Sequence, residues 1–300
     1  MIKVDRSKEP CPKTLLKTGV TERDNNVAIV QNDLNGELTF RAYKAKDVQA
    51  ALQRLFHKKC AYCESYFASV TAADIEHFRP KGKSFPNGVV KSGFIGYYWL
   101  ASEWNNLLLS CPGCNRPMQA EIFGVGKIIT MGKHDQFPLR DEKYRCLKHG
   151  DVAALQREEK YRLLIHPCQE DPEEYFEYVI KDAGKGGIKA KGGLRGIKAE
   201  RAGKSIEVYA LYRIELAKER ARHLDDLQNR ILGIQHAMIT YTKAITDLDK
   251  KFQMDFINNQ ILLLLKFEEP DQKFSAMSKQ LIGEFLATLS PELKEMVGRK

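Results

Sequence analysis

Two Cys-x-x-Cys pairs constrain this chain more than any other feature of its sequence: Cys60 with Cys63, and Cys111 with Cys114. Four cysteine thiolates form the tetrahedral ligand set that structural zinc prefers, so we expect the two pairs to meet at one ion. The pairs could instead be unrelated, or act as redox dithiols. A thioredoxin-like dithiol belongs to an alternating α/β pattern, which this sequence lacks. We therefore predict a structural Zn²⁺ site.

The charge of the chain favours an acidic partner. Its 300 residues carry a formal net charge of +9, which is typical of proteins that bind nucleic acid. The opening residues 1–6 are too charged for a secretory signal, and no apolar run is long enough to span a membrane. We expect a cytoplasmic protein without a membrane partner, in which the cysteines stay reduced. Three further cysteines are expected to be small buried hydrophobic residues: Cys11, Cys146 and Cys168.

The sequence predicts an α+β fold in four segments. They are an N-terminal arm with a lead-in helix (residues 1–59), a domain that contains both cysteine pairs (60–180), a basic glycine-rich loop (181–204) and a helical C-terminal region (205–300). The loop is predicted from its content of Lys, Arg and Gly. It could be a solvated linker or a contact to backbone phosphates.

Hydrophobic spacing predicts the elements that flank the cysteines. Apolar residues at helical spacing indicate an amphipathic helix over residues 45–56, which leads into Cys60. Short apolar runs predict strands over residues 73–78 and 107–109. A helix is expected after Cys114, but prolines and glycines specify it poorly.

Two other regions carry weaker local signals. The Asn35-Gly36 pair between apolar runs predicts a short β-hairpin. The C-terminal region is expected to contain helices over residues 205–248, with a break near Gly233, and over 255–267 and 271–288.

Glu76 and His77 lie between the two cysteine pairs and have the chemistry of a hydrolytic site. Histidine is suited to take a proton from water at neutral pH. A carboxylate together with amide oxygens forms a hard ligand set that suits magnesium. Phosphodiester hydrolysis needs both a base for water and a cation for the phosphate. A Glu-His pair alone is more often a surface feature, but its place between the cysteine pairs, with Asn106 and Asn115, favours catalysis.

These residues together resemble the HNH nuclease motif, also called the ββα-metal fold. The resemblance rests on Cys60-x-x-Cys63, Glu76-His77-x-x-Pro80, Asn106-Leu107 and Cys111-x-x-Cys114-Asn115. It implies that His77 is the general base and that Glu76 and Asn115 hold a catalytic Mg²⁺ or Mn²⁺. It also implies that Asn106 orients the histidine, with Asn105 as the rival for that role. The implied fold is a ββα-metal core with structural zinc, followed by a mainly helical region.

Basic residues near the motif are candidates for phosphate contacts. Arg79, Lys81 and Lys83 follow the Glu-His pair, and we expect them to meet phosphates rather than bases. Relatives of the motif often carry a lysine a few residues after the last Asn, and Arg116 is the nearest basic residue here. The alternative is that these residues lie in a solvated loop.

A narrower resemblance covers most of the chain. The sequence is similar to the HNH subunit of Septu-type anti-phage defence systems, including retron-associated versions. The similarity lies in residues 1–6, 60–64, 76–81, 137–139, 163–167 and 171–173, and in the pattern Tyr212-Arg213-x-x-Leu216. It implies an effector endonuclease that works with an ABC-type ATPase.

Several functions therefore remain open from the sequence. The leading hypothesis is a metal-dependent HNH endonuclease that hydrolyses nucleic acid, with DNA favoured over RNA. Alternatives are a non-catalytic, zinc-stabilised nucleic-acid-binding module, a stand-alone restriction-type nuclease, and an effector that cleaves RNA or tRNA. A binding module would leave Glu76, His77 and the two asparagines without a role.

Overall fold

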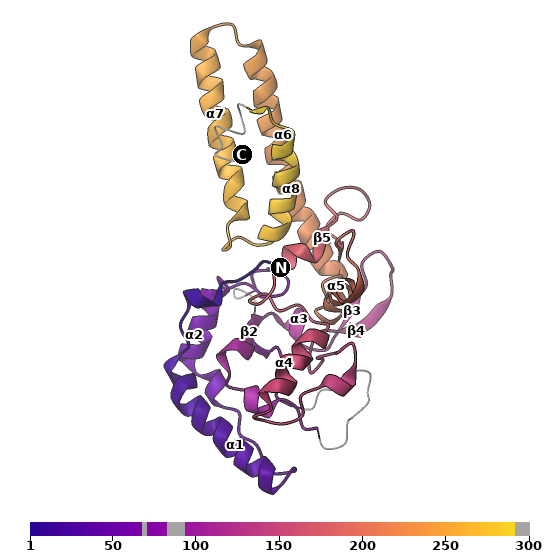
Figure 1. Cartoon of the computed structure of the whole chain (residues 1–300). Helices are drawn as coiled ribbons and strands as arrows, with labels where there is room; N and C mark the ends of the chain where they lie inside the picture. Colours follow the sequence, from indigo (N-terminus) through magenta and orange to yellow (C-terminus); the bar gives the residue numbers. More distant parts are fainter. Residues whose placement is uncertain (68–70, 83–93, 292–300) are drawn as a thin grey trace. The chain divides into compact units, whose positions relative to one another are not determined.

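The computed structural model describes residues 1–67, 71–82 and 94–291, so the predicted phosphate contact Lys83 lies outside the described residues (Figure 1). The chain divides into two compact units. The first comprises Met1–Glu177 with Lys189–Arg213, and the second comprises Tyr178–Ile188 with Ile214–Lys300. Helices and small two-stranded sheets make up the fold, which confirms the predicted α+β class.

Most of the strands belong to the first unit. Its helices are α1 (Val20–Asn32), α2 (Lys46–Leu55), α3 (Pro112–Asn115), α4 (Val152–Tyr161) and α5 (Gly196–Val208). Its strands are β1 (Asp74–His77), β2 (Leu107–Ser110), β3 (Met118–Glu121) and β4 (Ile128–Met131). Strands β5 (Phe176–Tyr178) and β6 (Ile188–Ala190) form a further pair where the chain passes between units.

Strand β2 lies at the centre of the first unit. Leu107, Leu108 and Leu109 are all fully buried, so both faces of this strand are covered. A continuous apolar run is the pattern expected for such a strand, because alternation appears only where one face is solvated. Helix α2 packs against β2 with the apolar side that contains Leu52 and Leu55, as its spacing predicts. The predicted helix and both predicted strands are thus confirmed.

Strands β1 and β2 pair antiparallel, and β2 runs directly into the second cysteine pair. Glu76 lies opposite Leu108 and His77 opposite Leu107. Helix α3 follows but is only one turn long, and the β3–β4 hairpin continues the chain where a longer helix was expected. The hairpin returns to α3, where the backbone N–H of Lys133 donates to the Cys114 carbonyl at 2.9 Å.

The predicted N-terminal hairpin is wrong, because its first apolar run belongs to helix α1. The chain does turn at Gly36, but the returning segment is held by a side chain rather than by a strand ladder. The Asn26 amide donates to the Thr39 carbonyl at 2.7 Å and accepts from the Thr39 N–H at 3.0 Å. The buried side chain of Asn26 on α1 therefore makes the backbone hydrogen bonds to the returning segment that the second strand of a hairpin would have made.

The predicted loop over residues 181–204 is also wrong, since β6 and much of α5 lie within it. Composition suggested a loop, but α5 buries Ala202, Ser205 and Val208 at helical spacing within the first unit. Its Arg201 is held by Glu170 at 2.8 Å. The two compact units meet along the chain near residues 177, 188 and 213.

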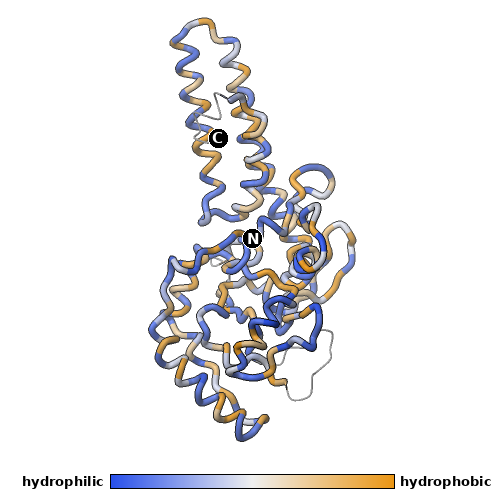
Figure 2. Tube along the Cα trace, viewed as in Figure 1, coloured by the Kyte–Doolittle hydropathy of each residue, from blue (hydrophilic) through white to orange (hydrophobic). Residues whose placement is uncertain are grey.

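The second unit is helical, which confirms the predicted C-terminal region. It contains α6 (Ile214–Lys243), α7 (Asp247–Leu265) and α8 (Ser275–Ala287), and α6 and α7 run antiparallel side by side (Figure 1). Helix α6 continues through Gly233 without the predicted break. Hydrophobic and hydrophilic residues alternate along these helices (Figure 2). No helix in the described part of the chain is both long and apolar enough to cross a membrane.

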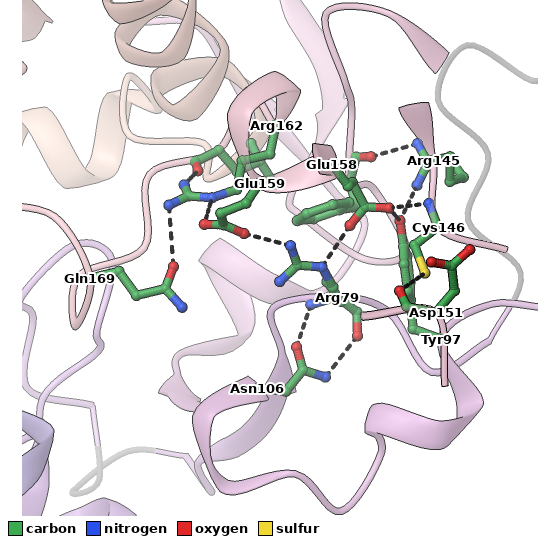
Figure 3. Close-up of polar contacts among 12 residues, drawn as sticks. Arg79, Tyr97, Asn106, Arg145, Cys146, Asp151, Glu158, Glu159, Arg162 and Gln169 are labelled. Atoms are coloured by element: carbon green, nitrogen blue, oxygen red, sulfur yellow. Dashed lines mark hydrogen bonds and ion pairs between the residues drawn. The ribbon is translucent and has the colours of Figure 1, made fainter. Parts of the chain in front are cut away.

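A buried polar network fixes helix α4 to the segment that follows β1 (Figure 3). Glu158 is fully buried and accepts from Arg79 Nε at 2.7 Å, from the Tyr97 hydroxyl at 2.6 Å and from the Cys146 N–H at 2.7 Å. Arg79 also pairs with Glu159 at 2.6 Å. The Tyr97 N–H in turn donates to the Pro80 carbonyl at 2.8 Å. The network therefore holds both ends of the segment between residues 80 and 97.

Candidate active site and metal centre

The two cysteine pairs meet in the first unit, as the sequence predicts. The Sγ atoms of Cys60, Cys63, Cys111 and Cys114 all lie within 4.8 Å of one another, and all four residues are buried. Four buried cysteines at this separation could hold a metal such as zinc. Cys11, Cys146 and Cys168 lie outside this cluster, which we call the thiol centre.

Backbone geometry shapes the first knuckle of the thiol centre. The Glu64 N–H donates to the Cys60 carbonyl at 3.0 Å, and Glu64 itself has a positive φ of 64°. The Ala61 N–H donates to the Leu109 carbonyl on β2 at 2.8 Å, so this knuckle is fixed to the strand that carries the second one. Hydrogen bonding from Cys111 and the other thiols lowers the pKa of Cys63, which favours the thiolate that metal binding requires.

Arg213 covers the thiol centre from a distant part of the chain. Its guanidinium lies 3.4 Å from Cys114 Sγ, 3.8 Å from Cys63 Sγ and 3.9 Å from Cys111 Sγ. Gly113 makes room for it, because a Cβ there would lie 3.2 Å from Arg213 Nε. A metal with four thiolates carries net negative charge, which a cation at this position offsets.

Removing the Arg213 guanidinium should weaken metal binding. Residues that bond to metal ligands typically change metal affinity by about 10- to 100-fold when substituted, and we expect this range for Arg213→Met. Competition with a chromophoric chelator measures the affinity. Arg222→Met, which removes an exposed arginine of α6, is the matched control and should match the wild type. Equal zinc affinity in Arg213→Met and wild type would contradict the assigned role.

His77 lies at the end of β1 with one ring nitrogen fixed. Its Nε2 lies 3.0 Å from the Ala101 carbonyl, which can only accept, so Nε2 carries the hydrogen. The lone pair of the neutral ring is then on Nδ1, and no described residue donates to it. Burial, with help from the nearby Lys81 charge, lowers the pKa of His77 to about 3. The ring is therefore neutral at pH 7, with the Nδ1 lone pair unprotonated.

Glu76 is held by a lysine that the sequence did not suggest. Lys133 is completely buried, and its Nζ lies 2.5 Å from Glu76 Oε1 and 2.9 Å from the His77 carbonyl oxygen. Burial raises the pKa of the Glu76 carboxyl, and the Lys133 charge acts against this effect. Lys133 thus stabilises the carboxylate and positions the backbone of its neighbour. The β3–β4 hairpin delivers this lysine.

Asp74 organises the residues that follow the second knuckle. It lies two residues before Glu76, so both side chains project from the same face of β1. Its carboxylate accepts from Asn115 Nδ2 at 3.1 Å and from Arg116 Nε and Nη2 at 3.0 and 2.7 Å. These bonds turn the Asn115 amide so that Nδ2 faces Asp74, and no described donor reaches its Oδ1.

Asn106 lies behind the site and contacts backbone only. Its Oδ1 accepts from the Arg79 N–H at 2.7 Å, and its Nδ2 donates to the carbonyls of Arg79 and Leu100, each at 3.0 Å. These bonds fix the chain just after His77 and the segment that leads to Ala101. Asn105 offers only its backbone carbonyl, to His166 Nε2 at 3.2 Å. Among the described residues, the Asn106 side chain thus bonds to the backbone on both sides of His77, and the Asn105 side chain has no such bond.

A cavity of about 500 Å³ opens along β1. Five of the predicted site residues line it: Glu76, His77, Lys81, Asn115 and Arg116. Asn106 and Arg79 do not, and the guanidinium of Arg79 is buried and paired with Glu158 and Glu159. The structure thus gives Arg79 a scaffold position and does not bring it to the cavity.

Several residues of the cavity were missed by sequence reasoning: Tyr43, Lys44, Asp74, His134 and Asp135. Of these, Asp74 could have been found from the two-residue strand period that links it to Glu76. The others approach from distant segments and carry no local signal.

Comparisons with known proteins place the chain among defence proteins. It is 32% identical over 309 residues to the Septu protein PtuB of Bacillus mycoides strain KBAB4, covering 100% of this chain and 94% of that protein. It is also 26% identical over 183 residues to the Septu protein PtuA of the same strain, covering 59% of this chain and 21% of that protein. No protein-family model matches the chain.

Proposed function

The chain belongs to the family of the Septu protein PtuB, and from this premise we propose that it is a metal-dependent HNH endonuclease of an anti-phage defence system. Homology to PtuB indicates the defence role. The nuclease activity rests on a single observation. The neutral ring of His77 has Nε2 fixed on the Ala101 carbonyl, and His77 shares one cavity with Glu76 and Asn115.

We assign His77 as the general base. Because Nε2 donates to the Ala101 carbonyl, Nδ1 is left to accept the proton of a water that attacks the phosphate. Asn106 and Lys133 are positioning residues. The first fixes the chain that follows His77, and the second holds both the His77 carbonyl and the Glu76 carboxylate.

The oxygen donors beside His77 fit a hard divalent cation. Asn115 Oδ1 and Glu76 Oε2 have no hydrogen-bond donor among the described residues, whereas Lys133 engages Glu76 Oε1. Carboxylate and amide oxygens are ligands of Mg²⁺ and Mn²⁺, so we propose that Glu76 and Asn115 hold the catalytic ion. When bound, such an ion polarises the phosphate and acidifies water. Zn²⁺ is assigned to the thiol centre, where it has a structural role.

The proposed partners are nucleic acid and an ABC-type ATPase. The net charge of +9 favours a polyanion, and DNA is proposed ahead of RNA or tRNA. The partnership with an ATPase comes from the Septu-type family, and the similarity to PtuA agrees with a two-protein system. In such a system the ATPase would control when the nuclease acts.

The test is metal-dependent cleavage by the purified full-length chain. We expect nicked or linear product from supercoiled plasmid when Mg²⁺ or Mn²⁺ is added, and none without the ion. A parallel reaction with tRNA decides between the two classes of nucleic acid. Both reactions are repeated with the ATPase and ATP, because a gated effector is expected to be faster in the complex. Absence of metal-dependent cleavage under every condition would overturn the proposal.

Two alternatives make different predictions in the same assay. A zinc-stabilised binding module would bind nucleic acid without any cleavage. A stand-alone restriction-type nuclease would give discrete bands from the isolated chain, with no change when the ATPase is added. The cavity chemistry around His77 favours the effector nuclease over the binding module.

A further inference from the structure

Two lysines at the cavity differ from the other basic residues near the proposed site. The guanidinium of Arg79 is paired with Glu158 and Glu159, Arg116 is paired with Asp74, and Lys133 is paired with Glu76. Lys44 and Lys81 also line the cavity. Within the described residues, neither of these two ammonium groups forms an ion pair with a carboxylate.

Tyr43 brings the two lysines to His77. Its ring lies edge-on to the His77 ring, with 4.5 Å between centroids. Lys44 Nζ lies 5.5 Å from the centre of the Tyr43 ring, and Lys81 Nζ lies 5.4 Å from it. Cations are attracted to the face of an aromatic ring, so Tyr43 supports both ammonium groups beside the proposed base.

The N-terminal arm is fixed in this position by a buried carboxylate. Tyr43 and Lys44 belong to a short 3-10 helix over Ala42–Lys44. Glu22 on α1 accepts from the Arg41 N–H at 2.6 Å and the Ala42 N–H at 3.0 Å, just before them. Its other oxygen accepts from the Ser102 hydroxyl at 3.0 Å.

Ser102 follows Ala101, whose carbonyl holds His77 Nε2. One carboxylate therefore ties the turn that carries Lys44 to the segment that orients the proposed base. The arm is thus part of the site, and the position of Lys44 relative to His77 is set by buried contacts.

The two lysines also repel each other. Burial lowers the pKa of Lys81, and the charges of Lys44 and Lys133 act in the same direction, while Asp135 and Glu76 oppose them. Two cations beside one aromatic ring repel each other, and an anion that binds to both of them offsets this repulsion. Phosphate oxygens are acceptors for lysine, which binds them as a point charge.

We propose that Lys44 and Lys81 form a clamp that binds a backbone phosphate of the nucleic acid beside His77, with Tyr43 as its support. The clamp deepens the proposed nuclease function and rests on it for the identity of the ligand. Because the clamp contacts phosphate and no base, it adds affinity without sequence preference.

The test measures binding separately from cleavage. The parent protein is the full-length His77→Ala variant, in which the expected loss of ~10²- to 10⁴-fold in cleavage rate keeps product formation small while binding is measured. Lys44→Gln, Lys81→Gln and the double variant are compared in this background. Lys46→Gln, which changes an exposed lysine two residues away that does not line the cavity, is the matched control. Fluorescence anisotropy with a duplex DNA and a single-stranded RNA gives Kd over a range of salt concentrations.

Each clamp substitution should weaken binding at low salt by about three- to tenfold and reduce the slope of log K against log salt by about 1. Lys44→Arg and Lys81→Arg keep the charge and should bind like the parent. Lys46→Gln should match the parent in both affinity and slope. Unfolding curves of all variants establish that each one is folded.

Three results would overturn the clamp: unchanged affinity and slope in the double variant, an equal loss in Lys46→Gln, or no measurable binding by the parent. The cleavage assay of the wild-type chain separates this failure from that of the proposed function. If the wild-type chain cleaves nucleic acid but the clamp substitutions do not change binding, the nuclease proposal stands and the clamp proposal is rejected. If binding depends on Lys44 and Lys81 but the wild-type chain does not cleave, the clamp proposal stands and the nuclease proposal is rejected.

Discussion

Replacing His77 with alanine is expected to lower the rate of phosphodiester cleavage by ~10²- to 10⁴-fold, the usual contribution of a general base. The reason is geometric. Nε2 is committed to the Ala101 carbonyl, so Nδ1 is the ring atom that can take the proton from water. Initial rates of plasmid nicking with Mn²⁺ in excess measure the effect. Single-turnover conditions keep product release from masking the chemical step.

The controls for His77→Ala separate catalysis from folding. His77 is buried against Tyr43, so alanine leaves a small cavity. His77→Gln is the second variant, because its amide nitrogen reaches the position of Nε2 and can still donate to the Ala101 carbonyl, but it cannot act as the base. His236→Ala, which removes an exposed histidine of α6, should leave the rate unchanged. Cleavage at the wild-type rate by both His77 variants, with zinc content and unfolding midpoint preserved, would reject His77 as the base.

Replacing Cys114 with serine is expected to remove the zinc and unfold the first unit. The thiol centre joins the knuckle before β1 to the knuckle after β2, and Cys114 is fully buried. Structural zinc contributes ~10 kcal/mol or more of apparent binding free energy in small zinc domains, and that energy supports the fold. We expect zinc content to fall from one ion per chain to nearly none. We also expect the cooperative unfolding transition to be lost or moved to much lower temperature.

Cys11→Ser is the matched control for this experiment. Cys11 is partly exposed and lies outside the thiol centre, so its substitution should leave both zinc content and the unfolding midpoint unchanged. Metal content is measured by elemental analysis of the dialysed protein, and unfolding by circular dichroism. A Cys114→Ser protein that keeps one zinc and its midpoint would show that the centre does not need this ligand. Together with the His77 variants, the result separates the structural metal from the catalytic residues.

Part of the candidate site could be predicted because it depends on sequence patterns between residues that are close in the chain. The Cys-x-x-Cys spacing identifies the thiol centre, since two thiols on one tight knuckle are ligands by spacing alone. The apolar run of β2 and the helical spacing of α2 predicted buried elements correctly, because burial imposes those periods on the sequence. Glu76 and His77 could be singled out because they lie beside these elements.

Predictions from local sequence were wrong where contacts between distant residues determined the structure. The composition of residues 181–204 predicted a loop, but most of α5 lies there because its apolar side is buried in the fold. The Asn35-Gly36 turn was real, yet Asn26 on α1 held the returning segment and no strand was needed. Arg79 looked like a phosphate contact because nothing local distinguishes a basic loop residue from one that is paired with a distant helix.

The sequence by itself determined the chemistry of the proposed site, namely four thiolates, a carboxylate beside a histidine, and two asparagines, because these depend on residue type and short spacing. The tertiary structure decided what surrounds them. Lys133 reaches Glu76 because the β3–β4 hairpin folds back, Lys44 reaches the cavity because Glu22 anchors the arm, and Arg213 reaches the thiol centre past Gly113. Contacts between residues so far apart leave no periodic pattern in a single chain, so only the fold could show them.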